Sequence, residues 1–173
     1  MELWLSLQGI PAQGQEFTYA DQAIWTDNWT AFGLKLKPGK PLTATLFVQA
    51  QGQGYLVQGA ITGSVVMPCS RCVEESEQDI AASFTHFEEL TGVDESYPDE
   101  KFLREAGGVP ELDVAAFLWE QFALALPDKP LCRSECQGLC PRCGANLNAG
   151  VCSCPQGSAD PRMAVFRSLK VPH

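Results

Sequence analysis

The chain has 173 residues, of which 45% are hydrophobic, and this suits one globular domain with a core that does not depend on a metal. Its longest apolar run, residues 114–126, is interrupted by Glu120 and Gln121 and falls short of the ~20 residues of a membrane span, which excludes a membrane protein of that kind. The net charge of −9 is concentrated in residues 69–113, and the last sixty or so residues are mildly basic. An acidic surface repels nucleic-acid phosphates and attracts basic proteins, although residues 94–105 are better explained as a solvated loop.

The first forty residues give weak patterns. Residues 16–20 and residues 24–36 are each compatible with a strand. Trp25, Trp29 and Phe32 are expected in the core, because exposed aromatic side chains would need a functional reason and none is visible.

The next fifty residues predict an antiparallel sheet. Apolar and polar residues alternate over residues 42–49, and a turn at residues 51–54 leads into a second run over residues 55–67. Gly59 and Gly63 within that run predict bulges or strong curvature. A third alternating run follows over residues 75–87, so residues 69–72 lie at the tip between two antiparallel strands.

The second half begins with a predicted acidic loop over residues 90–110, which includes a short helical turn at residues 100–106. A helix over residues 112–126 is capped by Asp113, ended by Pro127 and buried against the sheet, with Glu120 and Gln121 on its narrow wet face.

These elements predict an α+β fold, in which an antiparallel β-sheet or partial barrel packs against one main helix. We expect a β-rich α+β core over residues 1–131 and a cysteine-rich, zinc-binding module over residues 132–156. An amphipathic helix or tail over residues 157–173 would begin at Asp160-Pro161.

The most informative residues are the eight cysteines, whose pattern core packing does not need. Two form Cys69-Ser-Arg-Cys72, and the other six fall within residues 132–154. In Cys140-Pro-Arg-Cys143-Gly, proline and glycine favour a tight turn that aims two thiolates at one point, as in a metal knuckle. Four disulfides would be typical of a secreted protein, but no secretion signal is visible, so we expect a cytoplasmic metal-binding chain.

The spacing favours a division into two sites. Cys140, Cys143, Cys152 and Cys154 make a compact set, which leaves Cys69, Cys72, Cys132 and Cys136 for a long-range site that joins the strand tip to the segment after the helix. The alternative is one local site made of Cys132, Cys136, Cys140 and Cys143. Four-thiolate sites are closed and therefore structural, so we expect two structural Zn²⁺ ions.

No catalytic arrangement is visible in the sequence. Of the two histidines, His86 falls on a predicted strand and His173 is the last residue. A lone strand histidine is more often structural than catalytic, and the sequence has no nucleophile elbow and no phosphate loop. We therefore expect a protein that is not an enzyme and has no small-molecule substrate.

Several segments together resemble a known family. They are Pro68-Cys69-Ser-Arg-Cys72, the helix end Ala125-Leu126-Pro127 followed by Pro130-Leu131-Cys132, the run Gly138-Leu139-Cys140-Pro141 to Asn148, Cys152-x-Cys154, and Asp160-Pro161-Arg162. From about residue 40 to its end, the chain is similar to the YceD-like family of large ribosomal RNA subunit accumulation proteins.

The resemblance implies a soluble cytoplasmic factor without known catalytic chemistry, which supports accumulation or processing of large-subunit ribosomal RNA. Its expected partners are a ribosomal protein, the large-subunit RNA or both. From the charge distribution, we expect the acidic middle to contact a basic ribosomal protein and the basic end to lie near RNA. Arg71, Arg133 and Arg142 are expected to offset the charge of the thiolates rather than to bind phosphate.

Two alternatives come from other classes of protein. A redox-sensing chaperone would release zinc on oxidation and hold unfolded clients, and its cysteines would have to be accessible. A disulfide oxidoreductase would need a thioredoxin-like βαβ unit around CxxC, and the antiparallel pattern around Cys69 disfavours it.

Overall fold

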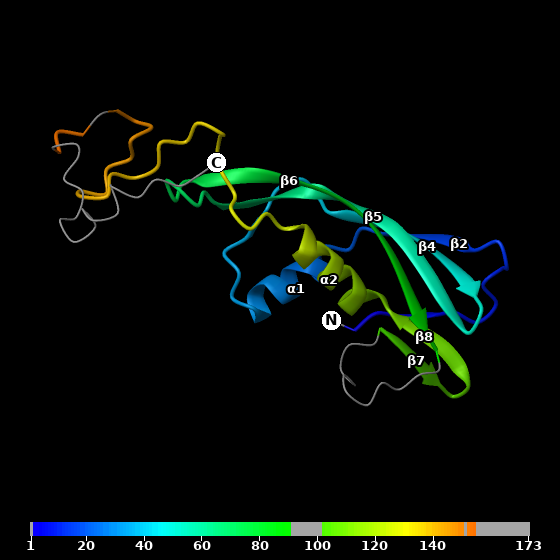
Figure 1. Cartoon of the computed structure of the whole chain (residues 1–173). Coiled ribbons are helices and arrows are strands. Elements are labelled where there is room, and N and C mark those ends of the chain that lie inside the picture. Colours follow the sequence, from blue (N-terminus) through cyan, green and yellow to red (C-terminus); the bar gives the residue numbers. More distant parts are fainter. Residues whose placement is uncertain (1, 91–101, 151, 155–173) are drawn as a thin grey trace, which may run out of the picture.

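The structure is a computed structural model that describes residues 2–90, 102–150 and 152–154. It has the predicted α+β class, with two antiparallel sheets and two helices, and no closed barrel is formed by the described residues. The cysteine-rich segment lies at one end of the long strands and a small hairpin lies at the other (Figure 1). The predicted C-terminal helix falls outside the described residues.

The larger sheet consists of β2 (Gln15–Tyr19), β3 (Lys37–Pro38), β4 (Thr43–Gln51), β5 (Gly54–Pro68) and β6 (Glu75–Glu89). β5 is central: β4 and then β3 pair with one of its edges, and β6 pairs with the other over its whole length. Leu42, Ala44, Leu46 and Val48 are buried, and so are Val57, Ile61, Val65 and Ile80. The predicted strands and the turn between β4 and β5 are thus confirmed.

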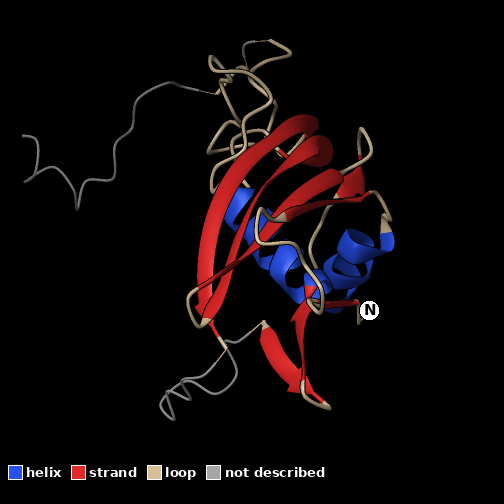
Figure 2. Ribbon diagram, turned by 90° about the vertical axis from the view of Figure 1, so that its right-hand side faces the viewer, coloured by secondary structure: helices blue, strands red, loops and turns tan. Residues whose placement is uncertain are grey.

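Glycine lets the sheet curve without a break in its ladders. The pairing of β5 with β6 is continuous through Gly59 and Gly63, and that with β4 is continuous through Gly59, so β5 shows the predicted curvature rather than the predicted bulges in these ladders (Figure 2). A Cβ at Gly59 would overlap the carbonyl oxygen of Thr45 and the ring of Phe84. Gly63 has a φ of 146°, which L-residues rarely adopt.

The smaller sheet contains β1 (Trp4–Ser6), β8 (Val109–Asp113) and β7 (Leu103–Ala106), in that order. The predicted helical turn is therefore wrong over residues 103–106, while residues 91–101 of the predicted loop lie outside the described residues. β7 and β8 form a hairpin around Gly107-Gly108, whose φ values of 62° and 80° match a tight hairpin turn. The Glu88 carboxylate accepts hydrogen bonds from the backbone N–H groups of Phe102 and Leu103, which ties β6 to the start of β7.

Residues 24–36 do not form the predicted strand, because Ala23–Ala31 is a helix, α1. Its core residues Ile24, Trp25 and Trp29 share one helical face. Phe32 was expected in the core, but it is 64% exposed and stacks on Trp119 of α2, with the ring centroids 5.5 Å apart.

Helix α2 (Val114–Ala125) occupies the predicted position, but α1 lies beside it, so two helices rather than one cover the sheet (Figure 2). The Asp113 carboxylate accepts a hydrogen bond from the backbone N–H of Ala116 at 3.0 Å, as expected of the cap. Glu120 is exposed as predicted, whereas Gln121 is half-buried. Within the described residues, no helix is both long and apolar enough to cross a membrane.

The centre of the core is an aromatic cluster around Phe117. This side chain is 0% exposed, and its ring lies 5.4 Å from that of Phe84 and 5.2 Å from that of Phe102. His86 lies 5.5 Å from the same ring, so this half-buried strand histidine packs against the edge of the core. The core therefore forms under the sheet, away from the cysteine tip.

Candidate metal centres

The first cysteine group joins two distant segments. Cys69 and Cys72 occupy the turn between β5 and β6, and Cys132 and Cys136 follow α2. All four sulfurs lie within 4.8 Å of one another, as the long-range pairing requires. Cys69 Sγ is 3.8 Å from Cys136 Sγ, and Cys72 Sγ is 3.6 Å from Cys132 Sγ.

These distances suit a tetrahedral metal ion. Zinc–sulfur bonds of about 2.3 Å give sulfur–sulfur edges of about 3.8 Å. A disulfide needs about 2.05 Å, and all eight cysteines are free thiols. Cys69, Cys72 and Cys136 are buried, so an ion among them would be largely shielded from water.

Several hydrogen bonds hold the segment after α2 against the strand tip. The backbone N–H of Ser70 donates to the Pro130 carbonyl at 2.8 Å, and the Gln78 side-chain amide donates to the Leu131 carbonyl at 3.2 Å. The Arg71 guanidinium donates to the Cys136 carbonyl at 3.0 Å. The first group therefore rests on a frame of contacts that do not involve sulfur.

The second group is local, and it gathers the sulfurs of Cys140, Cys143, Cys152 and Cys154 within 4.8 Å of one another. Cys140 is buried and Cys143 is exposed. The alternative site made of Cys132, Cys136, Cys140 and Cys143 is not the grouping found. The sulfurs thus meet in the two sets expected from the spacing, and their binding of metal stays a prediction.

In each CxxC turn, Cys69–Cys72 and Cys140–Cys143, which we call the two knuckles, the pKa of the first thiol is lowered. The backbone N–H of Cys72 lowers the pKa of Cys69 to about 6, and the backbone N–H of Cys143 lowers that of Cys140 to about 6. Desolvation of its sulfur beside the other three thiols, together with hydrogen bonds to them, raises the pKa of Cys132 to about 12, and a hydrogen bond with Cys143 raises that of Cys154 to about 12. Four crowded sulfurs therefore do not all ionise without a countercharge, which a divalent cation would supply.

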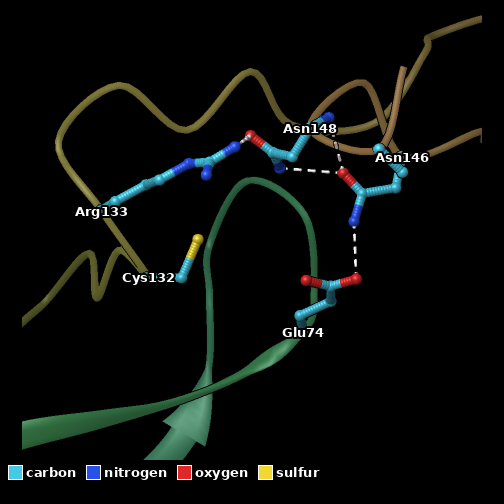
Figure 3. A pocket seen from close by; sticks show the side chains of 6 residues that line it. Glu74, Cys132, Arg133, Asn146 and Asn148 are labelled. Carbon is cyan, nitrogen blue, oxygen red and sulfur yellow. Dashed lines mark hydrogen bonds between the residues drawn. The ribbon is translucent and has the colours of Figure 1, made fainter.

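An amide network that the sequence did not predict supports the first group (Figure 3). Asn148 donates from its side-chain nitrogen to Cys136 Sγ at 3.3 Å, and its side-chain oxygen accepts from Arg133 at 2.8 Å. Asn146 donates to Glu74 at 2.7 Å and accepts from the Asn148 side chain at 2.8 Å. These asparagines link the second module to the strand tip.

The arginines beside the cysteines serve mainly as hydrogen-bond donors. Arg71 reaches backbone carbonyls, and Arg133 reaches Asn148 at the wall of a pocket of about 370 Å³. Their positive charges lie beside the first group, as an offset of thiolate charge requires, and that role stays a prediction.

The two knuckles share one backbone turn but differ at one residue. The N–H of Val73 donates to the Cys69 carbonyl, and the N–H of Gly144 donates to the Cys140 carbonyl, each at 2.9 Å. Val73 has a φ of 65° and Gly144 a φ of 72°. A β-branched residue is strained there, and the Val73 side chain is 64% exposed, so little packing compensates for the strain.

We expect Val73→Gly to raise the free energy of unfolding by about 1 kcal/mol, because relief of ~1–2 kcal/mol exceeds the entropy cost of glycine. Urea denaturation would measure this change. Val73→Ala is the matched control, since it shortens the side chain but keeps the Cβ and should gain little. A glycine variant no more stable than the alanine variant would show that the turn is unstrained.

A comparison with known proteins identifies a family that matches this chain. A family model described as large ribosomal RNA subunit accumulation protein YceD matches residues 57–170, a span that includes both cysteine groups. No solved structure matches the chain significantly.

Several curated relatives are also similar. An uncharacterized protein of Mycobacterium tuberculosis is 31% identical over 117 residues, which cover 66% of this chain and 55% of the relative. An uncharacterized protein of Mycobacterium leprae is 28% identical over 114 residues, or 63% of this chain and 50% of the relative. The chloroplastic large ribosomal RNA subunit accumulation protein YCED homolog 1 of Arabidopsis thaliana is 23% identical over 148 residues, or 70% of this chain and 46% of the relative.

The chain spans about half the length of the curated relatives it matches. The family model, by contrast, covers well over half of the chain and all eight cysteines. The chain therefore belongs to the YceD family, described as large ribosomal RNA subunit accumulation proteins.

Proposed function

We propose that this chain is a non-enzymatic, zinc-stabilised factor in biogenesis of the large ribosomal subunit. It would promote accumulation or processing of the large-subunit RNA by binding that RNA or a ribosomal protein. The observation that carries the proposal is the family match, which extends over both cysteine groups. We place this activity in the cytoplasm.

The chemistry of the two groups supports a structural role for the metal. Four protein sulfurs would complete the coordination of a tetrahedral zinc ion, which leaves no position for a substrate or an activated water. The ligands would be Cys69, Cys72, Cys132 and Cys136 in the first group, and Cys140, Cys143, Cys152 and Cys154 in the second. Zinc would fix the segment after α2 on the β5–β6 tip and present the polar surface around Arg133.

Depletion of this chain in its source organism tests the proposal. We expect the amount of large-subunit RNA to fall relative to small-subunit RNA, and wild-type chain to restore the ratio. A chain carrying both Cys69→Ser and Cys140→Ser should restore it poorly, whereas Ser70→Ala, in the same turn but without a ligand, should restore it fully. An unchanged RNA ratio on depletion would overturn the proposed function.

A binding assay separates the two kinds of partner. Filter binding with large-subunit RNA and pull-down with large-subunit proteins would be compared in moderate salt. If the basic end contacts RNA, charge reversal at its five basic residues should abolish RNA retention. They are Arg133, Arg142, Arg162, Arg167 and Lys170. RNA binding that survives this reversal would reject a contact through the basic end.

A redox-sensing chaperone is a second candidate, which the exposure of Cys143 favours. An exposed zinc-bound thiolate is open to oxidation. Loss of zinc on peroxide treatment, together with suppression of aggregation of an unfolded client protein, would support this role. Zinc retained through the same treatment would reject it.

A further inference from the structure

Strand β6 presents a long backbone edge. It pairs with β5 from Pro68↔Glu75 to Gly54↔Glu89, and no other strand among the described residues pairs with it. Within the same part of the chain, its backbone makes no backbone hydrogen bond outside that ladder. A strand of 15 residues is much longer than the typical 5–6, so many N–H and C=O groups face outward.

This edge has few of the usual protections against strand addition. Natural edge strands are short, bulged, covered by a loop, or carry proline or charges; of these, β6 has charges, and the segment after α2 reaches it at Gln78. β6 contains no lysine, proline or glycine, and its ladder with β5 has no bulge. β2, at the other side of the same sheet, has only five residues. The β6 edge therefore offers a much longer run of unpaired backbone groups than the β2 edge, guarded mainly by carboxylates.

The charges on β6 specify the chemistry of an added strand. Four exposed carboxylates lie near its two ends, at residues 75, 77, 79 and 89, and it carries no lysine or arginine. The remaining carboxylate, Glu88, has a side chain that is only 10% exposed, and it already accepts hydrogen bonds from the backbone of Phe102 and Leu103. The stretch between them, residues 80–87, has no carboxylate and includes the exposed Phe87. Lys37 and Lys40 pair with Glu75 and Asp79, so some of this acidity is already offset. A complementary strand would be uncharged in its middle and basic towards its ends.

A second copy of this chain fits poorly. Antiparallel pairing of two β6 strands about Ala82 would set Glu75 opposite Glu89 at both ends, and like charges in cross-strand pairs are destabilising. A basic partner avoids this repulsion. An RNA backbone would meet the same carboxylates as repulsive charges.

We propose that the β6 edge binds an extended, basic segment of a protein partner by β-strand addition. This inference rests on the proposed function and assigns a class to its partner: a protein with a Lys/Arg-flanked extended segment rather than RNA at this surface. Backbone hydrogen bonds would supply affinity, and the carboxylates at both ends would select against acidic or neutral strands.

The test uses the full chain and a fluorescent peptide of about thirteen residues, with alternating Thr and Val in the middle and Lys at both ends. Fluorescence anisotropy should give a Kd of about 100 μM or tighter. Two further peptides are N-methylated at alternate residues, one at the odd and one at the even positions. In one of them the methyl groups replace the N–H groups that would face β6, so at least one of the two should bind about tenfold more weakly. The same peptide with Glu in place of Lys should also lose about tenfold.

Variants and hydrogen exchange locate the contact. Glu77→Lys with Glu89→Lys should weaken peptide binding about fivefold, whereas the matched reversal Glu16→Lys on β2 should leave it unchanged. Exchange of alternate β6 amides should slow when the peptide is bound.

Three outcomes would overturn the proposal. One is no peptide binding by the full chain, as when another segment of this chain covers the edge. Another is equal binding of the unmodified peptide and both N-methylated peptides. The third is displacement of the peptide from β6 by an RNA oligonucleotide of similar length. None of these would change the expected effect of depletion on ribosomal RNA, so failure here and failure of the proposed function are distinguishable.

Discussion

Replacing Cys69 with serine should lower the free energy of unfolding of the metal-loaded protein by about 4 kcal/mol. The first cysteine group links residues 60 positions apart, and a crosslink that closes a loop of this length restricts the unfolded chain by about that amount. The buried Trp25 and Trp29 would report unfolding in urea through their fluorescence.

The position of each cysteine group determines how much its loss should lower the free energy of unfolding. Cys69 lies at the β5–β6 tip, where the sheet meets the segment after α2, so its loss should reach the whole domain. Cys140→Ser should change the main unfolding transition by less than about 1 kcal/mol, because the second group is local and lies outside the core. Ser70→Ala serves as the control within the same turn. Equal midpoint shifts for the two cysteine variants would refute the assignment of the long-range site as the one that clamps the fold.

The second large effect is expected at Phe117. Phe117→Ala should cost about 3–5 kcal/mol, because it leaves a cavity between the sheet and α2 that the neighbouring rings fill only in part. The rings of Phe84, Phe102 and His86 all lie within 5.5 Å of that of Phe117, centroid to centroid. Thermal and urea denaturation would both measure the loss.

Leu124→Ala is the matched control on the same helix. Its side chain is 73% exposed, so its removal should change stability by less than about 0.5 kcal/mol. The metal content of the Phe117 variant should not change, because the core and the cysteine tip are separate clusters. A loss below about 1 kcal/mol at Phe117 would contradict the packing described for this core.

Much of the sheet could be predicted because its signal is local. From Leu42 to Val48, every second residue is buried, and this period directly encodes a strand with one face on the core. The Asp113 cap and Pro127 set the ends of α2 in the same local way. Such patterns need no knowledge of distant contacts.

The errors arose where tertiary contacts or turn geometry decide the structure. α1 contains Thr and Trp residues, which have only weak helix propensity, and its burial against α2 decides its form. The Gly107-Gly108 pair is the local signal for the β7–β8 hairpin, but the acidic composition around it favours the prediction of a loop. The Phe32 ring packs by stacking on Trp119 at the surface, and hydrophobic periodicity does not reveal such a contact.

The grouping of the cysteines in the candidate site was predictable, but the residues that support the groups were not. Cysteine is informative because eight thiols in knuckle spacing have few alternative roles, and two sets of four follow from loop lengths. Asn148 carries no such signal, since asparagine is also a common loop residue. Its hydrogen bond to Cys136 Sγ depends on the fold of the second module, which local sequence does not specify.

Metal content per chain is the most direct measurement. Elemental analysis of the purified 173-residue chain should give two zinc ions per chain, and one ion in each of the variants Cys69→Ser and Cys140→Ser. A parent protein with a single ion, lost in Cys140→Ser but kept in Cys69→Ser, would contradict the long-range site between the strand tip and the segment after α2.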